Sequence, residues 1–414
     1  MIQKIKQNFN SDFAKNVLTL SVGAAIAQAL PIAIMPIVSR IYTSEELGEY
    51  GVVLTYVLLL STFASLELNR AIMLPRKSAE SILITSSIVK YTFLFCLVLM
   101  VVFCLLVLFN QLKAIYLVIP ILVFLSSLVS TLNMYLNRIS EFKILAKLKV
   151  VNSLVLTILQ VSTSILGALG LLVGNIAGNA VNLFLLVKKL FLNEPFKFTF
   201  KGFRTTFFKI LKKYNEFPIN SLPNRFVNLL SARSPYLVFD SFATSSVVGL
   251  YSMSGKIIQT PMSTLSASIS TVFMNKSSEY HNSGIPLRPL VMSTYKNLLL
   301  IAVVPYLVFL FFAPEIFAFT LGSEWYSAGT YTQILIPFLF ISFVNAPMNF
   351  IFFLKNELRY LLIFNISLLL ARFGGLILGF TLFNGVYSSL YLYSIVGVVF
   401  HVFFFIKIYK VTTL

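Results

Sequence analysis

Charged residues are scarce in this chain. Only 11% of its 414 residues are Asp, Glu, Lys or Arg, whereas 58% are hydrophobic. Because soluble domains carry about 25% charged residues, this composition excludes an ordinary soluble protein. Cysteine is scarcer still: only Cys96 and Cys104 occur. On a helix they would lie about 12 Å apart, which is too far for a disulfide between them.

Side chains and motifs that carry chemistry are also few. The only histidines are His281 and His401, and no Cys and His cluster has metal-ligand spacing. Paired carboxylates, a DxD sugar-nucleotide signature and a GxxxxGK[ST] phosphate loop are all missing from the sequence. The sequence therefore predicts no metal site and no catalytic residues, and we expect a protein that is not an enzyme and holds no cofactor.

What the chain has in abundance is long apolar stretches. A helix rises about 1.5 Å per residue, so about 20 apolar residues cross a hydrocarbon layer about 30 Å thick. Stretches of this kind are predicted at residues 17–39, 48–68, 86–109, 114–136, 149–168, 170–190, 217–239, 246–272, 295–313, 331–354, 359–381 and 386–407. We therefore expect an all-α integral membrane protein with about 12 transmembrane helices.

Basic residues set the expected orientation. Of the 32 Lys and Arg residues, 26 lie at the two ends of the chain or in the even-numbered gaps between spans, and only Arg40 and Lys113 lie in odd-numbered gaps. Because cytoplasmic loops collect Lys and Arg, both termini are expected in the cytoplasm. The net charge of +18 is thus explained by topology and by contacts with anionic membrane lipids, and no nucleic-acid partner is expected.

A sparse internal repeat divides the chain into two halves. Two short motifs recur about 200 residues later at matching positions: Thr43-Ser44 with Gly48-x-Tyr50 recurs as Thr244-Ser245 with Gly249-x-Tyr251, and Lys77-Ser78-Ala79-Glu80 recurs as Lys276-Ser277-Ser278-Glu279. We predict an N-terminal six-helix lobe at residues 1–190, a basic cytoplasmic linker at residues 191–216 and a C-terminal six-helix lobe at residues 217–414.

Four basic side chains fall inside spans of the second half. They are Arg225, Arg233, Lys256 and Arg372. An Arg or Lys at the bilayer centre costs about 2.5–3.5 kcal/mol, so such residues usually face a protein interior or a water-filled cavity. Snorkelling to the nearer headgroup layer is the alternative. Four cations together favour a cationic cavity.

Uncharged polar residues accompany these cations at helical spacing. The eighth span carries a polar stripe of Ser252, Lys256, Gln259, Ser263, Ser266 and Ser270, and the seventh span carries Asn220, Asn224, Asn228 and Ser231. Gln28 lies in the first span. Tight packing of membrane helices through small polar residues is the alternative explanation of the stripe. We predict that the cavity contacts its substrate through the four cations together with Asn224, Asn228, Gln259 and Gln28.

Acidic residues within or beside the spans are rare. Glu67 and Arg70 lie one turn apart near the cytoplasmic end of the second span, so we expect an i,i+3 ion pair. Asp240 lies at the outer end of the seventh span, where it either partly neutralises Arg233 or is exposed in the loop. Glu67, Arg70 and Asp240 are the candidates for coupling or gating, and a purely structural pair is the alternative for the first two.

Several helix-end motifs are shared with a known family. They are Ala27-Gln28-Ala29-Leu30-Pro31, Ser39-Arg40-Ile41-Tyr42-Thr43, Leu47-Gly48-x-Tyr50, Leu66-Glu67-Leu68-Asn69-Arg70-Ala71-Ile72-Met73-Leu74-Pro75, Gly249-Leu250-Tyr251, Leu321-Gly322-Ser323-Glu324-Trp325-Tyr326-Ser327-Ala328-Gly329 and Gln333-Ile334-Leu335-Ile336-Pro337. With these motifs the chain resembles the Wzx-type polysaccharide flippases over nearly its whole length. The resemblance implies the MATE-like fold of the MOP superfamily, with two six-helix lobes around a central cavity.

The resemblance also implies a function. Such proteins move an undecaprenyl-diphosphate-linked oligosaccharide, for example an O-antigen repeat unit in lipopolysaccharide biosynthesis, from the cytoplasmic to the periplasmic leaflet of the bacterial inner membrane. The implied partners are this lipid-linked oligosaccharide, membrane lipids, a polysaccharide polymerase and a chain-length regulator. Coupling to an inward H+ or Na+ gradient is implied as well.

Three other functions remain as alternatives. A drug/cation antiporter of the same superfamily should carry intramembrane carboxylates, whereas this cavity is expected to be basic. A lipid II flippase usually has fourteen spans, two more than predicted here. A membrane polysaccharide polymerase should carry a large outer loop, which the sequence lacks.

Overall fold

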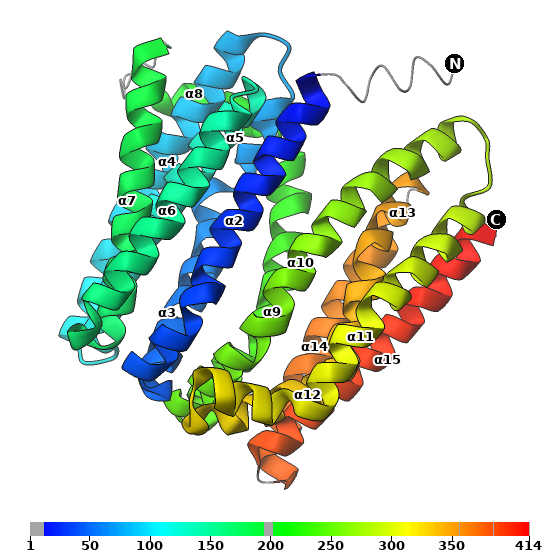
Figure 1. Ribbon diagram of the computed structural model, residues 1–414. Coiled ribbons are helices and arrows are strands. Elements are labelled where there is room, and N and C mark those ends of the chain that lie inside the picture. The colour runs from blue at the N-terminus through cyan, green and yellow to red at the C-terminus, as the bar shows by residue number, and fades with distance from the viewer. Residues whose placement is uncertain (1–11, 194–201, 356, 384, 414) are drawn as a thin grey trace. The chain divides into compact units, whose positions relative to one another are not determined.

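The computed structural model describes residues 12–193, 202–355, 357–383 and 385–413, and every secondary-structure element in these ranges is a helix (Figure 1). The prediction of an all-α protein is thereby confirmed. Part of the predicted basic linker, residues 194–201, lies outside the described residues, as do Lys4 and Lys6 of the N-terminal segment.

The elements follow one another as helices with short connections. The first half holds α2 (Asp12–Ile41), α3 (Ser44–Ser65), η1 (Leu68–Met73), α4 (Ser78–Leu108), η2 (Ala114–Leu117), α5 (Val118–Arg138), α6 (Phe142–Ser162), η3 (Ser164–Leu166), α7 (Ala168–Asn193) and α8 (Phe203–Lys213). The second half holds the π-helical turn η4 (Phe217–Ser221), α9 (Leu222–Phe242), α10 (Ser245–Asn282), α11 (Leu287–Leu321), η5 (Ser323–Trp325), α12 (Tyr326–Asn345), η6 (Ala346–Met348), α13 (Asn349–Leu354), α14 (Leu358–Phe383) and α15 (Val386–Thr413).

Ten helices of the described chain are long and apolar enough to cross a membrane. They correspond to the first six and the last four predicted spans. The two predicted spans outside this set coincide with α9 and α10, the helices that carry Arg225, Arg233 and Lys256. Polar side chains lower the hydropathy of these two helices, which is the expected signature of segments that line a polar interior.

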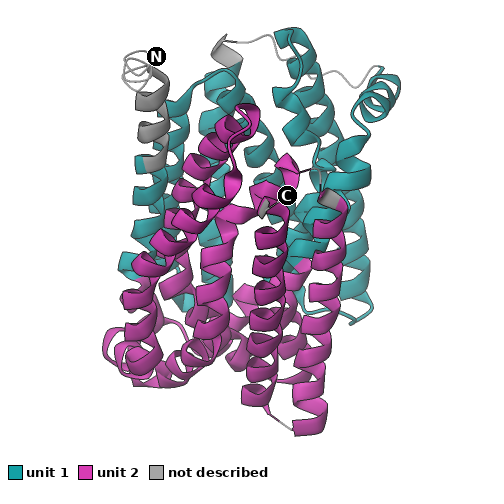
Figure 2. Cartoon of the chain, turned by 90° about the vertical axis from the view of Figure 1, so that its right-hand side faces the viewer, with its two compact units in different colours: residues 1–34, 53–229 teal, residues 35–52, 230–414 magenta. Residues whose placement is uncertain are grey.

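The chain groups into two compact units. Unit 1 comprises Met1–Ile34 and Val53–Leu229, and unit 2 comprises Met35–Val52 and Leu230–Leu414 (Figure 2). Helices α2, α3 and α9 therefore contribute residues to both units. The lobe boundaries at residues 190 and 217 remain a prediction.

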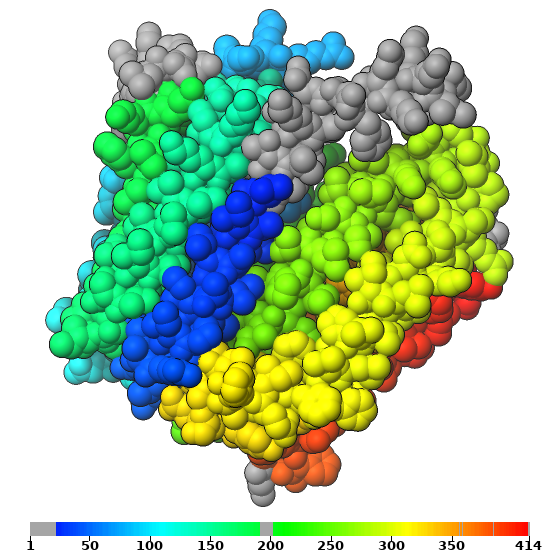
Figure 3. All heavy atoms as spheres, viewed as in Figure 1, coloured from blue at the N-terminus to red at the C-terminus, as the bar shows by residue number. Residues whose placement is uncertain are grey.

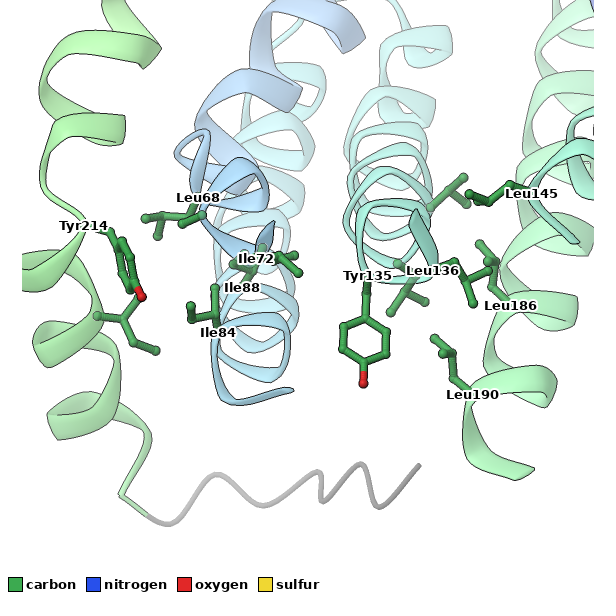
Figure 4. Close-up of a cluster of buried hydrophobic side chains, with 14 of the residues drawn as sticks. Leu68, Ile72, Ile84, Ile88, Tyr135, Leu136, Leu145, Leu186, Leu190 and Tyr214 are labelled. Carbon is green, nitrogen blue, oxygen red and sulfur yellow. The ribbon is translucent and has the colours of Figure 1, made fainter. Parts of the chain in front are cut away.

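Unit 1 is organised around a cluster of buried aliphatic and aromatic side chains. Leu68 and Ile72 of η1 lie among Ile84 and Ile88 of α4, and the cluster continues through α5, α6 and α7 to Tyr214 at the end of α8 (Figure 4). Burial of an aliphatic side chain of this size stabilises a fold by about 1.5–3 kcal/mol in water. The cluster fixes η1, the short segment that follows α3, against the long helices.

In unit 2 the first internal repeat is a reciprocal helix crossing. A Cβ atom added at Gly48 of α3 would collide with the carbonyl oxygen of Ser245, and one added at Gly249 of α10 would collide with the carbonyl oxygen of Ser44. The hydroxyl of Ser44 lies 2.6 Å from that of Ser246. The two glycines therefore recur for a structural reason. Because each has no side chain, the first turn of the other helix can approach its backbone closely. The second repeat has no such counterpart: Lys77 directly precedes the first residue of α4, whereas Lys276 lies inside α10.

Two of the shared helix-end motifs also meet in unit 2. The indole Nε1 of the fully buried Trp325 donates a hydrogen bond to the carbonyl of Ser39 at 2.9 Å, and the hydroxyl of Ser39 donates to the carbonyl of Leu321 at 2.9 Å. These bonds tie the end of α2 to the connection between α11 and α12. The two motifs are therefore parts of one hydrogen-bonded contact between helix ends.

The long helices keep broad apolar faces exposed. On α11, Leu300, Val304, Phe311 and Phe319 are exposed, and on α2, Val22, Ile26 and Ile37 are exposed. Figure 3 draws the surface of α11 in yellow. Together with the ten candidate spans, these faces identify a multi-pass membrane protein, because lipid tails rather than water suit such surfaces.

The crossing gives a first prediction. Gly48→Ala should destabilise the protein by about 1–3 kcal/mol, because the new methyl group forces two backbones apart. Gly374→Ala is the matched control, since nothing lies within 4 Å of a Cβ atom at Gly374. Thermal unfolding of the purified protein in detergent measures both variants. Equal Tm values for the two alanine variants would show that the crossing is not a tight one.

Candidate functional site

Arg372 is the most deeply buried of the predicted intramembrane cations. Its guanidinium carbon lies 4.6 Å from the ring centre of Phe338 in α12 and 4.9 Å from that of Tyr393 in α15. Nη1 donates a hydrogen bond to Ser231 Oγ of α9 at 3.2 Å. The residue is 5% exposed, and its Nε is buried with no hydrogen-bond partner among the described residues.

Arg233 and Lys256 belong to the same neighbourhood in unit 2. Arg233 lies 5.1 Å from the ring centre of Tyr236, and Lys256 lies 5.8 Å from that of Tyr50. Tyr251 contacts the Tyr236 ring edge-on at 5.2 Å. We call this group the cationic–aromatic cluster; it consists of Arg233, Lys256, Arg372, Tyr50, Tyr236, Tyr251, Phe338 and Tyr393.

The cationic–aromatic cluster suits an anion. A cation–π contact contributes about 0.5–2 kcal/mol, which offsets only part of the cost of removing a cation from water. Among the described residues of unit 2, no carboxylate forms an ion pair with Arg233, Lys256 or Arg372. Three positive charges with aromatic and hydroxyl neighbours therefore suit a negatively charged ligand, which would supply the missing compensation.

Arg225, the fourth predicted cation, lies in unit 1 and has a different partner. Its Nε lies 2.9 Å from Oε1 of Glu67, whose Oε2 lies 3.0 Å from Nε of Arg70. The predicted pair of Glu67 and Arg70 is thus confirmed, with Arg225 as a second partner. The Glu67 side chain is 4% exposed, whereas those of Arg70 and Arg225 are 51% and 48% exposed. We call these three residues the Glu67 cluster.

The backbone holds Glu67 in an uncommon conformation. Helix α3 ends at Ser65, and Leu66 and Glu67 follow with φ of 50° and 55°. Side chains other than glycine adopt this left-handed region rarely, at a cost of about 1–3 kcal/mol each, and such strain gathers at functional sites. Arg138 of α5 stabilises the segment, since its guanidinium donates to the carbonyls of Ile72, Met73 and Pro75.

Burial dominates the acidity of Glu67. It raises the pKa of this carboxyl above its ordinary value, while the charges of Arg225 and, to a smaller extent, Arg70 oppose the rise. The two arginines therefore compensate only part of the cost of keeping the carboxylate away from water.

The other predicted site residues are dispersed. Asn228 of α9 and Gln28 of α2 are exposed in unit 1, and Asn224 is half-buried there. In unit 2, Gln259 is exposed and folds back along α10 toward Gly255, and Asp240 is half-buried near the end of α9.

Sequence analysis missed the aromatic members of the site. Tyr236 lies three residues after Arg233, a spacing that brings side chains together on a helix, so this pair could have been found. Phe338 and Tyr393 come from α12 and α15, far from Arg372 in sequence, and only the fold identifies them. The sequence pattern indicates only a topology signal at Arg138, and its hydrogen bonds to the carbonyls of Ile72, Met73 and Pro75 follow from the fold alone.

Comparisons with known proteins agree with this architecture. A family model described as polysaccharide biosynthesis protein matches residues 37–330, more than half of the chain. No curated protein sequence matches the chain.

Solved structures show the same fold. The structure described as lipid II flippase MurJ, inward closed conformation, has a TM-score of 0.71 at 14% identity, covering 96% of this chain and 90% of that one. An inward-facing multidrug resistance MATE family transporter of the MOP superfamily has a TM-score of 0.64 at 14% identity, covering 94% and 98%. A MOP superfamily transporter from Pyrococcus furiosus has a TM-score of 0.60 at 14% identity, covering 98% and 97%. The predicted MATE-like fold is therefore confirmed.

The clamp formed by Arg138 gives a second prediction. Arg138→Ala should destabilise the protein by about 1.5–3 kcal/mol, because the carbonyls of Ile72, Met73 and Pro75 lose a charged donor. The control is Arg76→Ala, since Arg76 is an exposed arginine close to the same segment. Thermal unfolding in detergent should separate the two variants. An Arg138→Ala protein as stable as Arg76→Ala would contradict the clamp.

The third prediction concerns pH. Because the pKa of Glu67 is raised in the folded protein, its contribution to stability is fully present below the pKa of the unfolded chain and is lost as the pH rises through the folded pKa. The Tm of the unmodified protein minus that of Glu67→Gln should therefore decrease as the pH rises above about 4, the ordinary pKa of a glutamate. Glu141→Gln, which alters a half-exposed carboxylate paired with Lys189, is the control. A difference that grows with pH would refute the assignment.

Proposed function

Because the chain belongs to the polysaccharide biosynthesis protein family, we propose that it is a flippase for an undecaprenyl-diphosphate-linked oligosaccharide. In this proposal it moves the lipid-linked sugar from the cytoplasmic to the periplasmic leaflet of a bacterial inner membrane. The observation that supports the proposal best is the cationic–aromatic cluster, three cations without a protein carboxylate partner among the described residues of unit 2.

The chemistry of the substrate matches that observation. A diphosphate carries negative charge that must cross the hydrocarbon layer, and guanidinium groups bind phosphate oxygens through paired N–H donors. Arg233, Lys256 and Arg372 would hold the diphosphate, while Asn224, Asn228, Gln259 and Gln28 would contact the sugars. The long polyprenyl tail would stay among the lipid tails, where it costs little.

Alternating access is the transport mechanism that the fold suggests, since transporters of this kind expose one midplane site to each side in turn. We extend the proposal to coupling with a H+ or Na+ gradient, for which Asp240 is the candidate carboxylate, and to gating by Glu67 and Arg70. The termini would lie in the cytoplasm, and a polymerase and a chain-length regulator would act on the exported O-antigen or related units.

The main alternative is a drug/cation antiporter, because MATE transporters share the fold. A pump for cations needs negative charge in its cavity, whereas the cationic–aromatic cluster of unit 2 is positive. The family and the fold both resemble transporters rather than catalytic proteins, so a polymerase is disfavoured.

The fourth prediction tests the cluster. Arg233→Gln and Arg372→Gln should each lower translocation of lipid-linked oligosaccharide by about tenfold or more, the effect expected when a charged hydrogen-bond partner worth about 1.5–3 kcal/mol is removed. The measurement is the amount of lipid-linked oligosaccharide reaching the outer leaflet of reconstituted vesicles, at matched protein abundance. Arg288→Gln is the control, since Arg288 is an exposed arginine that stacks on Tyr409 instead.

The same assay can refute the proposal. Normal translocation by both cluster variants would remove the cationic–aromatic cluster from the mechanism. No translocation by the unmodified protein, together with efflux of cationic drugs, would favour the antiporter.

A further inference from the structure

The Glu67 cluster places one carboxylate between two guanidinium groups. Glu67 meets Nε of Arg225 at 2.9 Å through one oxygen and Nε of Arg70 at 3.0 Å through the other. With all three groups ionised the cluster carries a net charge of +1. The carboxylate is almost fully buried, whereas about half of each arginine side chain is exposed. The two cations are thus reachable, and the group that joins them is not.

This arrangement is built into the backbone on both sides. Glu67 has left-handed φ and precedes η1, and Arg225 comes four residues after the π-helical turn η4, which packs against η1. π-helical turns are rare and are frequently found at functional sites. The rings of Phe63 and Phe226, 5.0 Å apart, hold α9 beside α3 next to the cluster. Two irregular segments therefore meet where the carboxylate and the arginines meet.

We propose that Arg70 and Arg225 of unit 1 form a second binding site for a diphosphate group, in addition to the cationic–aromatic cluster of unit 2, and that the Glu67 carboxylate occupies this second site until a diphosphate displaces it. The identity of the ligand rests on the proposed function, because the lipid-linked substrate is what would bring a diphosphate to this membrane protein. Glu67 is then an internal substitute for the substrate anion.

The chemistry of the three groups supports such an exchange. Carboxylates and phosphates both accept paired N–H donors from arginine, so they compete for the same guanidinium groups. A diphosphate carries more negative charge than one carboxylate and can bridge two arginines that are half exposed. The carboxylate, in turn, keeps the arginines from holding the diphosphate too tightly for release.

A direct binding measurement tests this inference. The probe is inorganic diphosphate, titrated calorimetrically into the full-length protein purified in detergent. Glu67→Gln removes the competing charge and should lower the Kd for diphosphate by about tenfold or more, equivalent to about 1.4 kcal/mol. Combining it with Arg225→Gln should abolish that gain. Glu141→Gln should bind diphosphate like the unmodified protein.

A second variant covers the case in which Glu67→Gln does not fold. Glu67→Asp keeps the charge but shortens the side chain by one methylene, so it cannot reach both arginines as Glu67 does, and its affinity should lie between those of the unmodified protein and Glu67→Gln. An unchanged or weaker affinity in whichever of the two variants folds would overturn the inference.

The vesicle translocation assay keeps the two proposals apart. Tighter diphosphate binding by Glu67→Gln, with no translocation of lipid-linked oligosaccharide by the unmodified protein, would support the anion site and refute the flippase. Normal translocation with no gain in affinity would refute the anion site alone.

Discussion

A charged group that leaves water must find compensation within the protein, and this constraint explains most of what the two clusters look like. In unit 2, Arg233, Lys256 and Arg372 lie against aromatic rings, which attract a positive charge without cancelling it. In unit 1, Arg225 meets a carboxylate, which cancels it. The aromatic contacts of unit 2 leave the positive charges available to a ligand. The ion pair of unit 1 leaves Arg225 unavailable to a ligand until the Glu67 carboxylate moves.

The same requirement applies to backbone groups where helices are interrupted. Pro314 in α11 cannot supply the N–H that would satisfy the carbonyl of Leu310, and Gln333 of α12 donates its side-chain amide to that carbonyl at 2.9 Å instead. Arg138 does the same for the carbonyls of Ile72 and Met73 at the end of η1 and of Pro75 just after it. Because lipid tails offer no hydrogen bonds, a membrane protein can keep irregular backbone only where side chains replace the missing partners. Gln333 belongs to a shared motif for this reason.

The sequence predicts both the long helices and their place in a membrane, because each apolar stretch is about as long as a helix that crosses the hydrocarbon layer. The positions of the cations were visible too, since charge in an apolar run stands out. Their partners were not: Phe338 and Tyr393 are common residues in a chain that is 15% aromatic, and nothing in their local sequence distinguishes them. The ion pair of Arg225 with Glu67 joins residues far apart in sequence. The left-handed backbone at Leu66 and Glu67 cannot be predicted either, because neither residue is a glycine, the residue that usually adopts this conformation.

The charge balance of the Glu67 cluster also bears on what drives transport. If a diphosphate and the carboxylate compete for Arg70 and Arg225, protonation of Glu67 favours diphosphate binding, so a proton and the anion would travel in the same direction. Export would then carry protons outward against an inward gradient. Competition at Glu67 therefore suits gating rather than proton-driven export. A membrane potential that is negative inside contributes about 2.3 kcal/mol per charge per 100 mV and moves an anion outward. For a substrate whose headgroup is a diphosphate, this potential already has the sign that export requires.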